Sequence, residues 1–130
     1  MASIFTKIIQ GEIPSYKIAE NDHYIAILDA FPLVEGHVLV IPKQEVDKIF
    51  DLDKAIYAGL MDFAYDIAQA IEKAIPCLRV GIAVVGLEVP HVHVHLVPLN
   101  SPNDINFSNP KLKLESEQMS EIASKIKSYL

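Results

Sequence analysis

The sequence predicts an α+β fold: a five-stranded, mainly antiparallel sheet with one long central helix and a C-terminal helix. Two observations predict it. Short β-rich runs separated by turn residues occupy both halves of the chain, and two longer segments repeat their apolar residues every three or four positions. With 130 residues, 51% of them hydrophobic, the chain can bury a core without disulfides or metal. We therefore expect residues 1–130 to form a single domain.

The N-terminal part predicts an antiparallel meander. Three runs rich in β-branched and aromatic residues cover Tyr16–Ala19, Tyr24–Leu28 and Val38–Ile41. The Asn-Asp pair at 21–22 is a typical hairpin turn between the first two runs. Pro42 closes the third run, because proline has no N–H to donate to a central ladder.

The segment from Leu52 to Ala74 has the period of a helix. Asp51 or Asp53 can cap its first amides, and Pro76 disfavours helical geometry at the preceding residue, so the helix should end near Ala74. Small residues at Ala55, Gly59 and Ala70 would permit close packing against a sheet. The apolar repeat consists of Leu52, Ile56, Leu60, Phe63, Ile67, Ile71 and Ala74.

The remaining elements complete the sheet and add a second helix. Strand-like runs cover Arg79–Val85 and His91–Val97. A polar loop follows Pro98 and ends near Pro110, and Ser116 is a possible cap for the last helix. The apolar face of that helix contains Met119, Ile122, Ala123, Ile126 and Leu130.

Charge and composition exclude several classes of protein. The 11 Lys and Arg residues against 17 Asp and Glu give a net charge of −6, which disfavours a nucleic-acid partner because such binding depends on clustered cations. No apolar run approaches the roughly 20 residues of a membrane helix, and the N-terminus lacks the features of a signal peptide. Cys77, the one cysteine, excludes a disulfide framework and is interpreted as buried packing. We expect a cytoplasmic protein with no membrane partner.

Three of the five histidines, His91, His93 and His95, alternate with apolar residues. On a strand, a period of two directs all three imidazoles to one face and the apolar residues to the core. A single histidine in such a place is usually a polar residue on a half-solvated strand. Three in register point to a shared role, either in binding a metal or in catalysis.

A metal site is one alternative, because histidines at i and i+2 of a strand can both reach one zinc or iron ion. However, His91 and His95 would lie roughly 13 Å apart at about 3.3 Å per residue, so three in a row cannot easily share an ion. A fourth ligand would have to come from His37, His23 or a carboxylate, with no spacing to support it. We therefore expect no metal and no other cofactor.

Nucleophilic catalysis is the second alternative. The pKa of histidine lies near neutrality, so an uncharged ring with a free nitrogen is available to attack phosphorus or a carbonyl carbon. Neighbouring imidazoles can orient that ring and supply protons to a leaving group.

The pattern His-x-His-x-His-x-x with apolar residues at each x resembles the signature of the histidine triad (HIT) family of nucleotide hydrolases and transferases. The opening from Ile4 to Pro14 and the block from Asp29 to Lys43 are also similar to that family. The resemblance spans roughly residues 3 to 100, and it is greatest to the histidine triad nucleotide-binding branch.

The resemblance implies a mechanism and a role for each polar site residue. His93 would attack the α-phosphate of a purine nucleotide conjugate, such as a phosphoramidate, and form a covalent nucleotidyl-histidine that water hydrolyses. His95 would contact the phosphate and assist proton transfer, while His91 and His37 would form a supporting hydrogen-bond network. Asp29 falls at the ribose-binding position.

The resemblance also implies how the base and the leaving group are contacted. Phe5, Ile8 and Leu39 align with the apolar pocket that holds the base, although without the resemblance they would be read as core. Glu88 stands where other members place Ser or Thr facing the leaving group. A carboxylate there would repel an anionic leaving group and tolerate an amine.

The chain departs from the family pattern in two places. Leu87 stands where Gln is usual and no Asn occurs between positions 76 and 100, so the phosphate should be held by fewer donors. Because of this departure, a nucleotide-binding module with little turnover is the alternative function. Some members also carry a zinc site begun by two cysteines, and Ser3 and Thr6 occupy those positions, so that site should be absent.

The resemblance further implies a homodimer. In that branch the central helices and the strands before them pair across a two-fold axis. The helix expected over 52–74 is unusually apolar, and its Tyr57 and Phe63 are available for such a contact.

Overall fold

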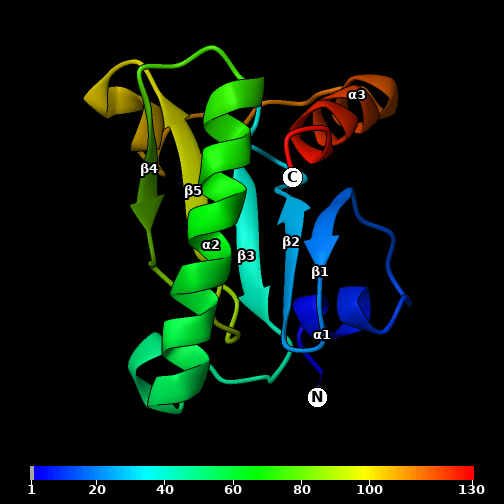
Figure 1. Cartoon of the computed structure of the whole chain (residues 1–130), viewed down its shortest axis with the longest axis vertical. Coiled ribbons are helices and arrows are strands. Elements are labelled where there is room, and N and C mark those ends of the chain that lie inside the picture. The colour runs from blue at the N-terminus through cyan, green and yellow to red at the C-terminus, as the bar shows by residue number, and fades with distance from the viewer. Residues whose placement is uncertain (1) are drawn as a thin grey trace.

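The computed structural model describes residues 2–130 and contains one five-stranded sheet flanked by helices (Figure 1). The strand order is β1-β2-β3-β5-β4, and all neighbouring strands are antiparallel. The predicted α+β fold is therefore confirmed, and β5 lies inside the sheet. The strands are β1 (Lys17–Glu20), β2 (Tyr24–Leu28), β3 (Val38–Pro42), β4 (Arg79–Ala83) and β5 (Val94–Leu99).

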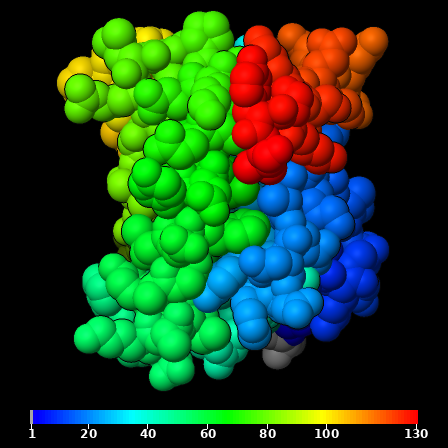
Figure 2. Space-filling model, in the orientation of Figure 1, coloured from blue at the N-terminus to red at the C-terminus, as the bar shows by residue number. Residues whose placement is uncertain are grey.

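The two faces of the sheet are covered differently. On one face lies α2 (Lys54–Ala74), and α3 (Ser116–Lys127) packs against α2 and β1, so that the two helices form a continuous surface (Figures 1 and 2). The opposite face carries the short α1 (Ile4–Ile9) and a smaller apolar cluster. Two 3₁₀ turns, η1 (Ile49–Asp51) and η2 (Pro102–Ile105), precede α2 and follow β5. No helix within residues 2–130 is both long and apolar enough to span a bilayer.

The meander is confirmed with small shifts at its ends. The strand β2 has the expected bounds, β1 begins one residue later than expected, and β3 includes Pro42 as its last residue. Every residue of β2 and β3 is buried, because both faces of the sheet are covered at these central strands.

The central helix begins and ends near the predicted positions, but its cap differs. It starts at Lys54, two residues after Leu52, and ends at Ala74 because Ile75, before Pro76, has an extended backbone. Asp53 is the N-cap residue, yet its side chain accepts no capping hydrogen bond, so the predicted side-chain cap is wrong.

Close packing of α2 on the sheet depends on Gly59. A Cβ at this position would collide with the hydroxyl of Tyr24, which donates to the backbone carbonyl of Ile56 over 2.9 Å. Ala70 is also buried, as predicted, whereas Ala55 is exposed, so that small residue has no packing role.

The two C-terminal strands are shorter than predicted. Ala83 ends β4 two residues early, and β5 begins at Val94 rather than His91. The reason is a change of partner: the N–H of Val92 donates to the carbonyl of Val46 over 2.8 Å, and pairing with β3 begins only at Val94. The alternation persists through this extended segment, since Val92, Val94 and Leu96 all lie in the core beneath α2.

The termini contain features that the sequence pattern did not predict. The short helix α1 is one of them, and the Oγ of Ser3 caps it by accepting the N–H of Thr6 over 3.0 Å. Helix α1 matters for the site, because it brings Ser3 and Phe5 to the sheet face opposite α2.

Helix α3 begins at Ser116, but its cap is Glu115, which corrects the prediction. Glu115 and Gln118 form a reciprocal capping box, so the longer carboxylate does the work expected of the serine. Leu130 lies beyond the helix and is exposed, and therefore does not extend its buried face. Cys77 is half-buried rather than buried.

Candidate active site

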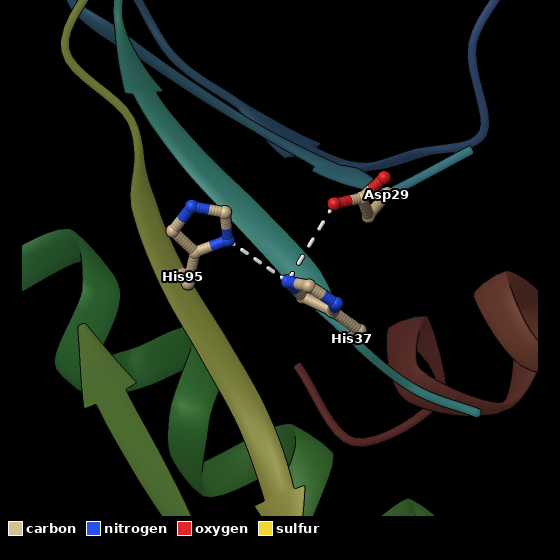
Figure 3. A group of neighbouring side chains, drawn as sticks. All are labelled: Asp29, His37 and His95. Atoms are coloured by element: carbon tan, nitrogen blue, oxygen red, sulfur yellow. Dashed lines mark hydrogen bonds and ion pairs between the residues drawn. The ribbon is translucent and has the colours of Figure 1, made fainter. Parts of the chain in front are cut away.

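Three polar side chains meet on the sheet face that points away from α2. Asp29 follows β2, His37 precedes β3 and His95 lies within β5, so three segments distant in sequence supply them. Their direct neighbours Leu28 and Val38 face the core under α2, and the strand period therefore turns Asp29 and His37 to the other face. Figure 3 shows the three side chains directed toward one another.

His93 lies in the extended segment before β5 and keeps one ring nitrogen free. Its Nδ1–H donates to the backbone carbonyl of His91 over 2.7 Å, which leaves the lone pair on Nε2. The ring is 8% exposed and packs against Phe5, with 4.9 Å between ring centroids, and against His95, with 5.0 Å. A fixed imidazole with an unprotonated nitrogen is the arrangement that nucleophilic attack requires.

His37 and His95 form a hydrogen-bonded pair whose tautomers follow from their neighbours. The Nδ1 of His37 accepts the N–H of Leu33 over 3.0 Å, so neutral His37 carries its hydrogen on Nε2. That Nε2–H donates to the Nδ1 of His95 over 2.9 Å, as Figure 3 shows. Neutral His95 must then carry its own hydrogen on Nε2, where it is available to a phosphate or a leaving group.

Burial keeps these two imidazoles uncharged. It lowers the pKa of His37 to about 3 and the pKa of His95 to about 4, because a charged ring loses its hydration inside the protein. Burial also raises the pKa of the Asp29 carboxyl, although the Phe31 N–H that donates to its Oδ1 opposes the change. Asp29 Oδ2 lies 3.6 Å from His37 Nε2. His37 and His95 are therefore uncharged donors and acceptors near neutral pH.

A second hydrogen-bond network holds His91 from the side of α1. The Nε2–H of His91 donates to the carbonyl of Pro42 over 2.8 Å, so its Nδ1 accepts the Ser3 hydroxyl over 2.7 Å. Glu45 Oε1 in turn accepts the Ser3 backbone N–H over 2.7 Å and the Thr6 hydroxyl over 2.6 Å. These bonds lower the pKa of the Glu45 carboxyl to about 2, and burial lowers the pKa of His91.

The sequence analysis identified His91 but missed Ser3 and Glu45 as its partners. The positions of Ser3 and Thr6 were noted only as places without cysteine. Ser3 is 88 residues from His91 and 42 residues from Glu45, so no local pattern links them.

Asp29, His37 and His95 are also the group whose ligand atoms lie close enough for a metal ion, all within 4.8 Å of one another. This differs from the zinc or iron site considered from spacing, because both ring nitrogens of His91 and the Nδ1 of His93 are held by other partners. The hydrogen bond between His37 and His95 already accounts for the close approach of the two rings. The distances alone therefore fit either a bound metal ion or this hydrogen bond.

A strap formed by residues 101–113 lies against the histidines, and the sequence left its role open. The ring of Phe107 contacts His95 edge-on at 4.7 Å between centroids and lies 6.4 Å from His37. The Nζ of Lys111 donates to the carbonyl of Phe107 over 2.6 Å. Sequence reasoning missed both residues. A lone aromatic residue in a polar loop was the one available signal.

The apolar residues expected around the base lie together on this same face. Phe5 and Leu39 are buried and Ile8 packs at the edge of their cluster. Glu88 is exposed in the loop before the histidines, and its charge raises the pKa of Asp29. Leu87 is 89% exposed. His23, considered above as a metal ligand, is exposed. The remaining buried members of the apolar cluster are Ile25, Ile27 and Ile41.

Comparison with known proteins agrees with this geometry. Residues 10–101 match the model of the HIT domain. The chain is 34% identical to an uncharacterized HIT-like protein of Borreliella burgdorferi, over 95% of this chain and 94% of that protein. It is 33% identical to the adenosine 5′-monophosphoramidase hnt1 of Schizosaccharomyces pombe, over 98% of this chain and 100% of that one. A solved HIT-like protein of Bartonella henselae, described as involved in cell-cycle regulation, superposes with a TM-score of 0.85 at 29% identity, covering 98% and 96% of the two chains.

Proposed function

Because this chain belongs to the HIT domain family of nucleotide-binding hydrolases, we propose that it cleaves a phosphoramidate or related bond at the α-phosphate of a purine nucleotide. The observation that carries the proposal is the state of His93, whose Nδ1–H is held by the His91 carbonyl while Nε2 stays free. The reaction proceeds through a covalent nucleotidyl-histidine on that nitrogen.

The reaction has two steps that together consume one water molecule. In the first step the Nε2 lone pair of His93 forms a bond to the α-phosphorus while the bond to the leaving nitrogen breaks. The departing nitrogen takes up one proton from solvent and leaves as an amine, assisted by a hydrogen bond from the Nε2–H of His95, which the His37 hydrogen bond keeps on that side of the ring. In the second step hydroxide from water bonds to phosphorus as the bond to His93 Nε2 breaks, the remaining water proton returns to solvent, and the nucleoside monophosphate leaves.

The nucleotide is positioned by groups on the same face of the sheet. The Asp29 carboxylate accepts the ribose hydroxyls, and the Phe31 N–H fixes the orientation of its Oδ1. Phe5, Ile8 and Leu39 contact the base, since they form an apolar cluster beside His93. Holding ribose and base in this way would fix the α-phosphorus in line with the nucleophile.

Glu88 is proposed to select the leaving group. Its exposed carboxylate acts on Asp29 and repels an anionic leaving group more than an amine. We expect Glu88→Ser to improve hydrolysis of a dinucleoside diphosphate relative to a phosphoramidate, measured as the ratio of kcat/KM values. An unchanged ratio would remove Glu88 from this role.

We also propose that the chain acts as a homodimer. The strand before α2 is β3, which lies inside the sheet and is not free to pair as expected, so the proposed pairing uses α2 and the edge strand β4. The strand β4 is at an edge of the sheet, and Phe50, Ile82 and Val84 are exposed beside it. They surround a hollow of about 280 Å³ together with Tyr57 of α2. Phe63 packs instead on Tyr24 inside the protomer, which leaves Tyr57 as the aromatic residue available to a partner. A free strand edge beside apolar side chains favours association with a second copy.

The test measures release of AMP from an adenosine 5′-phosphoramidate by the wild type and by His93→Ala, with bound metal quantified in the same samples. We expect turnover to fall by more than about 100-fold in the variant while AMP binding is retained. Loss of wild-type activity with a chelator, together with stoichiometric metal, would replace this mechanism by a metal-dependent one.

A second candidate function is a nucleotide-binding module with little turnover. It is favoured by Leu87, which is exposed and offers no hydrogen-bond donor to the phosphate. Tight AMP binding together with a turnover no faster than that of His93→Ala would establish this function instead.

A further inference from the structure

We propose that Lys111 is a further phosphate-binding residue of this site, held in place by the strap of residues 101–113. The inference rests on the proposed function, because it requires a nucleotide whose phosphate lies beside His93 and His95. It adds to the triad a permanent cation from a part of the chain that the triad motif does not include.

Two contacts fix the strap to the site. Phe107 packs its ring against His95 at 4.7 Å between centroids. The N–H of Leu112 donates over 2.8 Å to the carbonyl of Pro32, in the loop that connects Asp29 to His37. The position of Lys111, one residue before Leu112, is therefore determined by the same loop that supplies two site residues.

The ammonium group of Lys111 is held by backbone carbonyls. Its Nζ donates to the carbonyl of Phe107 over 2.6 Å and to that of Asn109 over 3.4 Å, and it lies 5.9 Å from the centre of the Phe107 ring. An ammonium has three N–H donors, so one remains for a ligand. The same Phe107 ring contacts His95, so one aromatic ring separates the charge from the imidazole assigned to the phosphate.

The charge of Lys111 acts on three site residues. It lowers the pKa of His37, His95 and Asp29, which means that it lies within electrostatic reach of each. Glu88 acts on Asp29 with the opposite sign. In a chain with a net charge of −6, this cation counters the negative potential that an incoming phosphate would meet.

A cation at this point would also supply a hydrogen-bond donor that the phosphate otherwise lacks. An α-phosphate is anionic, and His95 offers it one neutral N–H. Leu87 offers none, since its side chain is apolar. Hydrogen bonds between a charged donor and a phosphate are roughly twice as strong as neutral ones, so one lysine can replace a missing amide.

The experiment compares AMP with adenosine, which has the same base and ribose but no phosphate. Dissociation constants of both ligands are measured for the wild type, Lys111→Met, Lys111→Arg and Lys113→Met. Lys113 is an exposed lysine two positions away and serves as the matched control. We expect Lys111→Met to weaken AMP binding roughly tenfold, with adenosine binding changed less than about twofold. Lys111→Arg should retain most of the affinity for AMP, and Lys113→Met should match the wild type.

Three outcomes would overturn the inference. Equal loss of AMP and adenosine binding in Lys111→Met would mean that the lysine only supports the strap, and unchanged AMP binding would mean that it does not touch the phosphate. If the wild type bound neither ligand, the proposed function itself would fail, which distinguishes that case from the first two. Should Lys111→Met fold poorly, the wild type still provides a test: AMP affinity must fall with rising salt more steeply than adenosine affinity.

Discussion

The chemistry of the site depends on which nitrogen of each histidine carries a hydrogen. A backbone N–H from Leu33 determines the tautomer of His37, and His37 determines that of His95. A backbone carbonyl determines the tautomer of His93. Neighbouring groups thus give otherwise identical side chains different free nitrogens, which suits the roles that we propose: nucleophile for His93 and hydrogen-bond donor for His95.

The hydrogen bonds from Leu33 to His37 and from His37 to His95 predict how His37→Phe changes the kinetics. Without the Nε2–H of His37, nothing keeps the hydrogen of His95 on its outward nitrogen, so kcat for the phosphoramidate should fall by roughly 100-fold while KM changes little. Steady-state kinetics on the purified variant test this. His23→Phe is the matched control, because His23 is exposed and its ring neighbour is Tyr24 rather than a site residue. This variant should leave kcat unchanged.

The lowered pKa values of the buried histidines predict acid sensitivity. Both His37 and His95 take up a proton near pH 6.5 when unfolded but only near pH 3 to 4 when folded. Between about pH 6.5 and 4 the unfolded state therefore binds more protons, and stability is lost as the pH falls through this range. Asp29 contributes with the opposite sign, because its pKa is raised in the folded state.

We expect the free energy of unfolding in urea to be lower at pH 5 than at pH 7 by on the order of 3 kcal/mol. His37→Phe should reduce that difference, since one of the buried imidazoles with a lowered pKa is gone, whereas His23→Phe should not. Equal stability at the two pH values would contradict the assignment of neutral, buried imidazoles.

At the scale of single residues, the sequence predicted the three histidines on one face of a strand. It did not predict the side chains that hold them in place. Three histidines in register can be recognised locally, and the residues His37 and Asp29 could be recognised from the family resemblance. Ser3 and Phe107 could not, because each reaches the histidines through tertiary contacts that no short pattern records.

At the scale of elements, local periodicity predicted most of the structure. The bounds of β2 and the end of α2 follow from turn residues and from Pro76, which act within a few positions. The start of β5 was wrong because the bonding partner of Val92 is Val46, outside the sheet. Helix α1 has six residues, too few for a helical period to be distinguished from an apolar cluster.

The short α1 helix yields a prediction about Ser3, whose hydroxyl serves two elements. In Ser3→Ala the cap of α1 and the bond to His91 Nδ1 are lost together. We expect a loss of about 1 to 2 kcal/mol in the free energy of unfolding, measured by urea denaturation. Ser3→Thr retains the hydroxyl and should recover most of that loss. If Ser3→Ala were as stable as the wild type, the network around His91 would not contribute to stability.

At the scale of the whole molecule, the larger apolar core and the candidate site lie on opposite faces of the sheet. The face under α2 and α3 contains the larger apolar core, and the opposite face contains the histidines, Asp29 and the strap. The sequence predicted the five strands and the two long helices. It did not predict that β5 is inserted between β3 and β4, because strand order depends on contacts between distant segments.

The exposed edge of the sheet leads to a prediction about assembly. Ile82 lies in β4 and is 50% exposed beside the hollow that we assign to a second copy. Ile82→Glu would place two charges of the same sign across the two-fold axis, so we expect a monomer where the wild type is a dimer, measured by sedimentation or light scattering. Leu78→Glu, which alters another exposed apolar residue outside that hollow, is the control and should remain dimeric. A monomeric wild type would contradict the proposal.

The place of β5 inside the sheet has a consequence for synthesis on the ribosome. The meander of β1, β2 and β3 emerges first, but the inner edge of β3 has no partner until residues 94–99 have left the exit tunnel. His91, His93 and His95, and then Phe107 and Lys111, emerge only at that stage. A nascent chain interrupted before this point therefore exposes an unpaired apolar edge to aggregation and carries no assembled nucleotide site. Under the function that we propose, AMP release would therefore begin only after these segments have folded onto the meander, and it would report completed folding.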